Sequence, residues 1–99
     1  MVKIVWTEMA VNDLKEIFDY ISEDSNHYAN KTVNMIYQKA QIISVNLYAG
    51  RVVPEFSEPL LRELIFSNYR IVYRIKNEVQ VDILRVYHSA RLLKRNRIK

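Results

Sequence analysis

The sequence predicts an α+β domain in which two helices pack on one face of an antiparallel sheet. Residues 10–47 repeat apolar side chains at spacings of three and four, which is the period of a helix. Residues 60–87 are instead rich in β-branched and aromatic residues, separated by gaps so short that only antiparallel hairpins fit. With 99 residues, the chain is expected to form a single domain with one core.

The first half predicts a short strand followed by a helical hairpin, over residues 1–47. The strand-like start, Lys3–Trp6, precedes Thr7, which can cap the first helix, and Asp24 and Ser25 are candidates for the turn and second cap. The expected inward stripes are Ala10, Leu14, Ile17 and Ile21 in the first helix, and Ala29, Val33, Ile36, Ala40, Ile43 and Leu47 in the second. Helices with such narrow stripes, joined by a short turn, are expected to pack antiparallel and to cover a sheet face.

The second half predicts a three-stranded antiparallel meander, over residues 60–88, with strands at 60–66, 69–76 and 78–87. The N-terminal strand is expected to join this sheet at an edge or beside a central strand. A basic C-terminal tail, residues 89–99, follows the last strand. The only concentrated turn signals, Gly50, Pro54 and Pro59, separate the helical half from the sheet.

The middle strand carries arginines on one of its faces. Ile71, Tyr73 and Ile75 alternate with Arg70 and Arg74 along it. Because successive side chains of a strand point to opposite faces, we expect the apolar set to be buried beneath the helices and the arginines to be displayed on an open face. There the arginines are either solvated or paired with Glu63 across the strands.

Charge is distributed unevenly along the chain. Residues 1–59 contain five Lys/Arg and eight Asp/Glu, a net charge of −3, whereas residues 60–99 contain ten and three, a net charge of +7. This asymmetry indicates either a polyanionic partner, namely nucleic acid or an acidic protein segment, or a solvated basic tail.

Several classes of site and location are not expected. The chain has no cysteine and only two histidines, His27 and His88, so we expect no disulfide, no structural metal and no cofactor. No apolar run approaches the roughly 20 residues of a membrane-spanning helix, and the N-terminus lacks the apolar stretch of a signal peptide. We therefore expect a cytoplasmic protein that does not bind membranes.

Three segments carry a resemblance to a known family. Behind the strand and helical hairpin come GRVVPE (50–55), LRELIFSNYRIVYRI (61–75) and VDILRVYHSAR (81–91). Their order and spacing resemble the RelE/ParE superfamily, the toxins of bacterial type II toxin–antitoxin and plasmid-stabilisation modules, over essentially the whole chain. The resemblance implies a small α+β toxin with a concave sheet face, which a cognate antitoxin neutralises in a hetero-oligomeric complex.

One branch of this superfamily implies an enzyme. RelE-like members are metal-independent endoribonucleases that cut mRNA on the ribosome. The resemblance would make Arg70 the phosphate contact, Glu55 the general base and His88 a proton-transfer group, which are suitable side chains for these roles. However, Ser89 follows His88 where such nucleases have a tyrosine, and Glu63 lies near the position of their paired lysines.

The other branch implies a binding poison, and we favour it. ParE-like members are linked to inhibition of DNA gyrase. Here His88 would only close the last strand, and Glu55 would pair with Arg51 or with an arginine of the open face. Residues expected to bind the partner or nucleic acid are Arg51, Arg62, Arg74, Arg85 and Arg91. A toxin remnant that survives only as half of an autoregulating complex is a third, weaker interpretation.

Overall fold

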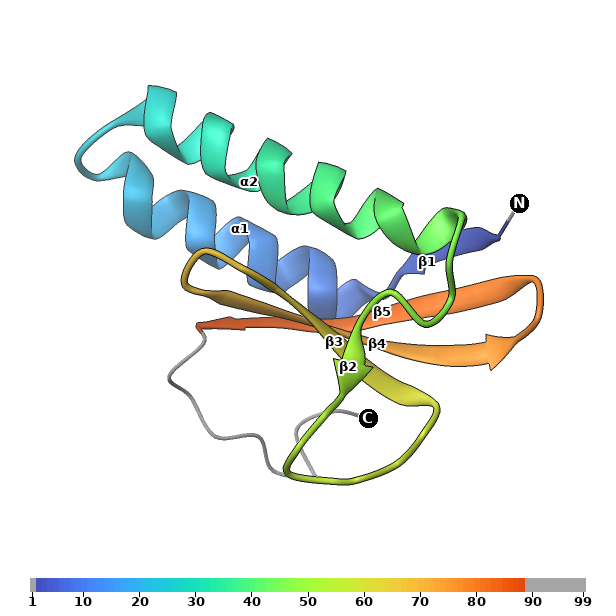
Figure 1. The fold of residues 1–99 in the computed structure, drawn as a ribbon. Coiled ribbons are helices and arrows are strands. Elements are labelled where there is room, and N and C mark those ends of the chain that lie inside the picture. The colour runs from blue at the N-terminus through green and yellow to red at the C-terminus, as the bar shows by residue number, and fades with distance from the viewer. Residues whose placement is uncertain (1, 89–99) are drawn as a thin grey trace.

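A computed structural model describes residues 2–88 and has two layers, a helical hairpin lying over a sheet (Figure 1). The elements in chain order are β1 (Lys3–Trp6), α1 (Glu8–Ser22), α2 (Asn26–Ala40), the 3₁₀ helix η1 (Gln41–Ser44), β2 (Arg51–Val52), β3 (Leu61–Phe66), β4 (Tyr69–Asn77) and β5 (Gln80–His88). The predicted α+β class is confirmed. The tail predicted at residues 89–99 lies outside the described residues.

The helical hairpin begins at the predicted caps. The Thr7 side chain accepts a hydrogen bond from the Ala10 backbone N–H, and the Ser25 side chain accepts one from Tyr28. These bonds satisfy backbone donors that a helix start leaves without partners. Helix α2 is shorter than the apolar stripe that predicted it, which extended to Leu47. It ends at Ala40, and the 3₁₀ helix η1 that follows still buries Ile43.

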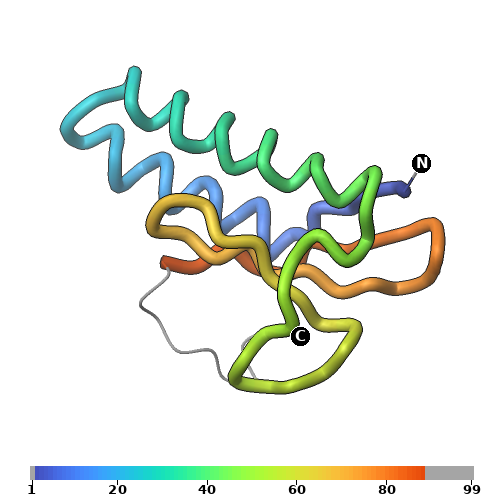
Figure 2. The backbone as a smooth tube through the Cα atoms, viewed as in Figure 1, coloured from blue at the N-terminus to red at the C-terminus, as the bar shows by residue number. Residues whose placement is uncertain are grey.

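The sheet has five strands in the order β1-β5-β4-β3-β2, so β4 is central as predicted. Strand β1 lies at one edge and runs parallel to β5, with Lys3 opposite Gln80 and Trp6 opposite Ile83. Figure 2 shows the N-terminal segment, in blue, on the same side of the molecule as the orange beginning of β5, with which it pairs. The sequence did not predict β2, a two-residue strand that pairs antiparallel with β3 at the opposite edge.

The main core lies between the helices and the sheet. It contains Ile71, Tyr73 and Ile75 of β4, as expected, packed against Ala10 of α1 and Ile36 of α2. Ala10, Ala29 and Ala40 are fully buried, and small side chains at such positions let helices lie close to their neighbours.

The opposite face of the sheet is not open, which corrects the prediction. A second cluster buries Val53, Leu61, Val72 and Tyr87, with Phe56 and Leu84 packed against it. The segment of residues 53–60, here called the 53–60 loop, follows β2 on the side away from the helices (Figure 1). Because this loop contributes Val53 and Phe56, β4 is covered on both faces.

Candidate functional site: a buried charge cluster and a separate histidine groove

Arg70 lies at the centre of a group of four charged residues, Arg51, Glu55, Glu63 and Arg70, which we call the charge cluster. Arg70 and Glu63 are buried, whereas the Arg51 side chain is exposed. Its Nε donates to Glu63 Oε1 at 2.7 Å, while Nη1 and Nη2 donate to the two oxygens of Glu55 at 2.7 Å each. Glu63 Oε2 accepts from Arg51 Nε at 2.7 Å. The prediction that Arg70 is displayed on an open face is therefore wrong, because only 5% of the residue is exposed.

Strand register explains why these side chains meet. Glu63 of β3 lies opposite Arg51 of β2 and opposite Val72 of β4. Arg70 precedes Val72 by two residues, so it points to the same face and reaches Glu63 diagonally. Glu55 arrives from the 53–60 loop. Its predicted pairing with an arginine of this face is confirmed, and the partner is Arg70.

The glycine of the GRVVPE segment is required by close packing beside this cluster. A Cβ on Gly50 would lie 2.5 Å from the Glu63 carbonyl oxygen and 2.8 Å from Tyr73 Cε1. The Gly50 N–H donates to the Tyr73 hydroxyl at 2.9 Å, and that hydroxyl donates to the Leu47 carbonyl at 2.8 Å. Burial raises the pKa of the Tyr73 phenol.

The carboxylates of the cluster fix the Arg70 guanidinium in its charged form. Its pKa is raised, chiefly because its hydrogen bonds to Glu55 favour the cation and secondarily because of Glu63, although burial opposes this effect. Both edges of the planar fork therefore already hold carboxylates. In this conformation the edges on which a phosphate would bind bidentately are occupied.

His88, the third residue predicted for catalysis, lies on the other face of the sheet. It is opposite Tyr69 in the strand register, whereas Arg70 is opposite Tyr87. Because neighbouring residues of a strand alternate faces, His88 shares the face of Tyr69 and not that of Arg70. Its ring lies 6.2 Å from the Tyr69 ring, edge to face.

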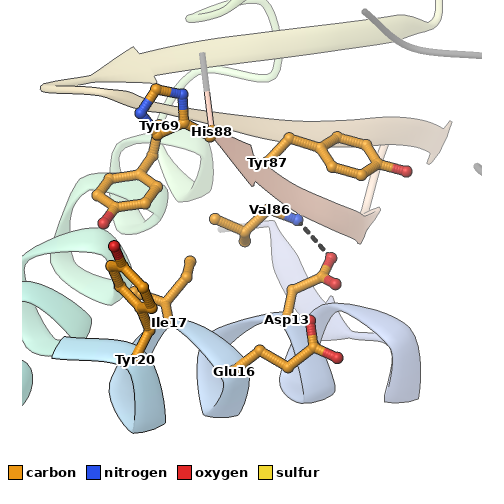
Figure 3. Close-up of a pocket in the computed structure, with 8 residues that line it drawn as sticks. All are labelled: Asp13, Glu16, Ile17, Tyr20, Tyr69, Val86, Tyr87 and His88. Atoms are coloured by element: carbon orange, nitrogen blue, oxygen red, sulfur yellow. Dashed lines mark hydrogen bonds between the residues drawn. The ribbon is translucent and has the colours of Figure 1, made fainter. Parts of the chain in front are cut away.

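A groove of about 350 Å³ adjoins His88, between α1 and the ends of β4 and β5. Figure 3 shows Asp13, Glu16 and Tyr20 projecting from α1 below Tyr69 and His88. The structure therefore brings Glu55 and Arg70 together but does not bring His88 to them.

Asp13 is a buried acid that the sequence analysis did not single out. It accepts hydrogen bonds from Arg85 Nε at 2.7 Å and Nη2 at 2.9 Å, and from the Val86 backbone N–H at 2.9 Å. The register of β4 and β5 shifts by one residue beside Arg85, leaving Leu84 without an opposite residue. The pKa of Arg85 is raised, first by its hydrogen bond to Asp13. The hydrogen bonds of Asp13 to Arg85 and Val86 join α1 to the irregular part of β5.

Comparison with known protein families identifies the family to which the chain belongs. Residues 4–93 match the family described as the ParE toxin of the type II toxin-antitoxin system, parDE. The chain belongs to the ParE toxin family.

Solved structures agree with this assignment. The chromosomal ParDE toxin–antitoxin system of P. aeruginosa includes a chain with a TM-score of 0.73 and 27% identity, over 89% of this chain and 96% of that one. The toxin–antitoxin complex RelBE2 of Mycobacterium tuberculosis includes one with a TM-score of 0.66 and 22% identity, over 88% and 96%, which shows a shared fold. A search of curated protein sequences gives no significant match.

The arginines predicted to bind a partner of this ParE-family toxin differ in how far they are engaged within the chain. Arg85 is held by Asp13, and Arg62 donates to the Pro59 and Gly50 carbonyls and stacks over the Tyr48 ring. Arg51 and Arg74 are more accessible, with side chains 62% and 42% exposed. Arg91 lies outside the described residues.

Metal-binding clusters and membrane-spanning helices are both absent from residues 2–88 of the ParE-family chain. This part of the chain contains no group of three or more His, Asp or Glu residues arranged to hold a metal ion. Among the same residues, no helix combines the length and the apolar character needed to cross a membrane.

Proposed function

We propose that this ParE-family toxin acts by binding DNA gyrase rather than by cutting RNA. The observation that carries the proposal is the separation of the three candidate catalytic residues. Metal-independent RNA cleavage needs a base, an acid and a cation within hydrogen-bond reach of one phosphate. Here Arg70 and Glu55 are bound to each other on one sheet face, and His88 lies on the opposite face. This arrangement supports a binding role for the toxin.

The partner that neutralises the toxin is, in this proposal, a cognate antitoxin in a cytoplasmic hetero-oligomer. The similar chain from P. aeruginosa is part of a ParDE toxin–antitoxin system, which supports this pairing. Because the second half of the chain carries a net charge of +7, an acidic antitoxin segment would be attracted to it electrostatically.

Two reactions measured side by side test the target. Purified toxin is added to a DNA supercoiling reaction with gyrase and, separately, to translating ribosomes on which mRNA cleavage is followed. Inhibited supercoiling with intact mRNA supports the proposal. Ribosome-dependent cleavage with unaffected gyrase would overturn it in favour of a RelE-like nuclease.

His88→Ala provides the matched variant, because His88 is exposed and its loss leaves the charge cluster intact. Gyrase inhibition is expected to be the same for His88→Ala and the unaltered toxin. Arg70→Ala is less informative by itself, because loss of the buried Arg70 side chain can unfold the protein. The circular dichroism spectrum of this variant must therefore first match that of the unaltered protein.

A further inference from the structure

We propose that Glu55 is an internal ligand occupying an oxyanion site on Arg70, so that the 53–60 loop must release Glu55 before a phosphate or carboxylate from another molecule can bind there. This contact would keep the site closed in the isolated toxin. The proposal is independent of the toxin's target.

The two carboxylates of the charge cluster have different freedom to move. Glu63 lies on β3, its side chain is fully buried, and it holds the edge of Arg70 formed by Nε and Nη2. Glu55 lies in a loop, its side chain is 21% exposed, and it holds the outer fork formed by Nη1 and Nη2. If Glu55 moves away, Glu63 still orients the guanidinium, and the freed fork has the geometry that binds phosphate or carboxylate bidentately.

Charge balance indicates what would replace Glu55. The two arginines and two carboxylates of the cluster sum to zero. Without the Glu55 charge the cluster carries +1, and the Nη1 and Nη2 donors of the outer fork lose their carboxylate acceptor while Glu63 still pairs with Arg70. Charged donors in a largely buried position that lack an acceptor favour binding of an anion, so removal of Glu55 creates an oxyanion site.

The tether of Glu55 explains why the site is closed in the unaltered chain. A ligand attached through a short loop acts at an effective concentration in the millimolar range or above. A free anion that binds weakly therefore competes poorly with Glu55.

Anion titration of the full chain tests the proposal. Inorganic phosphate, acetate and a dinucleotide are added separately to the unaltered protein and to Glu55→Ala, and binding is followed through backbone amide NMR shifts in β3 and β4. Phosphate is expected to bind Glu55→Ala saturably and at least about tenfold more tightly than the unaltered protein. Acetate and the dinucleotide distinguish a carboxylate from a phosphodiester as the better occupant.

Glu58→Ala is the matched control, because it removes a carboxylate from the same loop and keeps the pair of Glu55 with Arg70. It is expected to bind phosphate no better than the unaltered protein. Glu55→Gln preserves the size of the side chain and replaces Glu55→Ala if the latter does not fold. The same weak binding in folded Glu55→Gln and in Glu58→Ala would overturn the proposal, as would a gain that survives Arg70→Gln in the Glu55→Gln background.

Discussion

Replacing Glu63 by glutamine should strongly destabilise the fold, because Glu63 bridges both arginines of the charge cluster. One of its oxygens accepts from Arg70 and the other from Arg51, at 2.7 Å each, and its side chain is fully buried. Glu63→Gln leaves a buried guanidinium with one carboxylate where it had two. Breaking a buried pair in this way costs about 3 to 5 kcal/mol of unfolding free energy. For a domain of this size, the melting temperature should fall by at least about 12 °C.

Urea denaturation followed by circular dichroism measures the effect, and Arg51→Ala provides the comparison. The Arg51 side chain is 62% exposed, so its ion pair with Glu63 is screened by solvent. We expect its removal to cost less than about 1 kcal/mol. A Glu63→Gln protein within 1 kcal/mol of the unaltered chain would refute the conclusion that the cluster stabilises this sheet face. A loss of similar size in Arg51→Ala would show that burial does not distinguish the two positions.

Three further substitutions and one control substitution test neighbouring contacts. Gly50→Ala should lower the unfolding free energy by about 3 kcal/mol in a denaturant titration, because its Cβ would meet the Glu63 backbone at 2.5 Å. Asp13→Asn should cost about 3 kcal/mol in the same assay, since it breaks the buried pair with Arg85, whereas the exposed Lys15→Ala should leave stability unchanged. The raised pKa of Tyr73 means that the unfolded chain ionises first as pH rises above 10, so stability is complete below that pH and falls above it. Tyr73→Phe, which cannot ionise, should show a shallower decline across this range; an equal decline would exclude Tyr73 as the cause.

Local patterns predicted much of this fold because they depend on neighbours in the sequence. The caps Thr7 and Ser25 and the alternation along β4 each follow from a few adjacent residues. The alternation along a strand predicts the face on which each side chain lies, but not which part of the chain covers that face. The 53–60 loop packs against β4 through Val53 and Phe56. The sequence shows that these two residues are apolar, but not that they pack against this face of the sheet.

The two ion-pair groups were only partly predictable, for a related reason. The sequence left open whether the arginines of the middle strand are solvated or paired with Glu63, and the structure shows Arg70 paired with Glu63 in one particular register of β3 and β4. Asp13 and Arg85 are 72 residues apart, and their contact occurs beside a one-residue irregularity at Leu84 that no turn signal marked. The pairing of Glu55 with an arginine was predictable, but the sequence left several arginines as possible partners.

The register of β5 against β4 also limits how RNA-cleaving chemistry could be engineered into this scaffold. Any side chain placed at position 88 points to the sheet face opposite that of Arg70, because the backbone register fixes its direction. Shifting β5 by one residue would move Val86 out of the core. The β5 residue opposite Arg70 is Tyr87, on the same face as the guanidinium. A proton-transfer group intended to work with Arg70 should therefore be grafted at Tyr87, with Glu55 removed to admit the substrate phosphate.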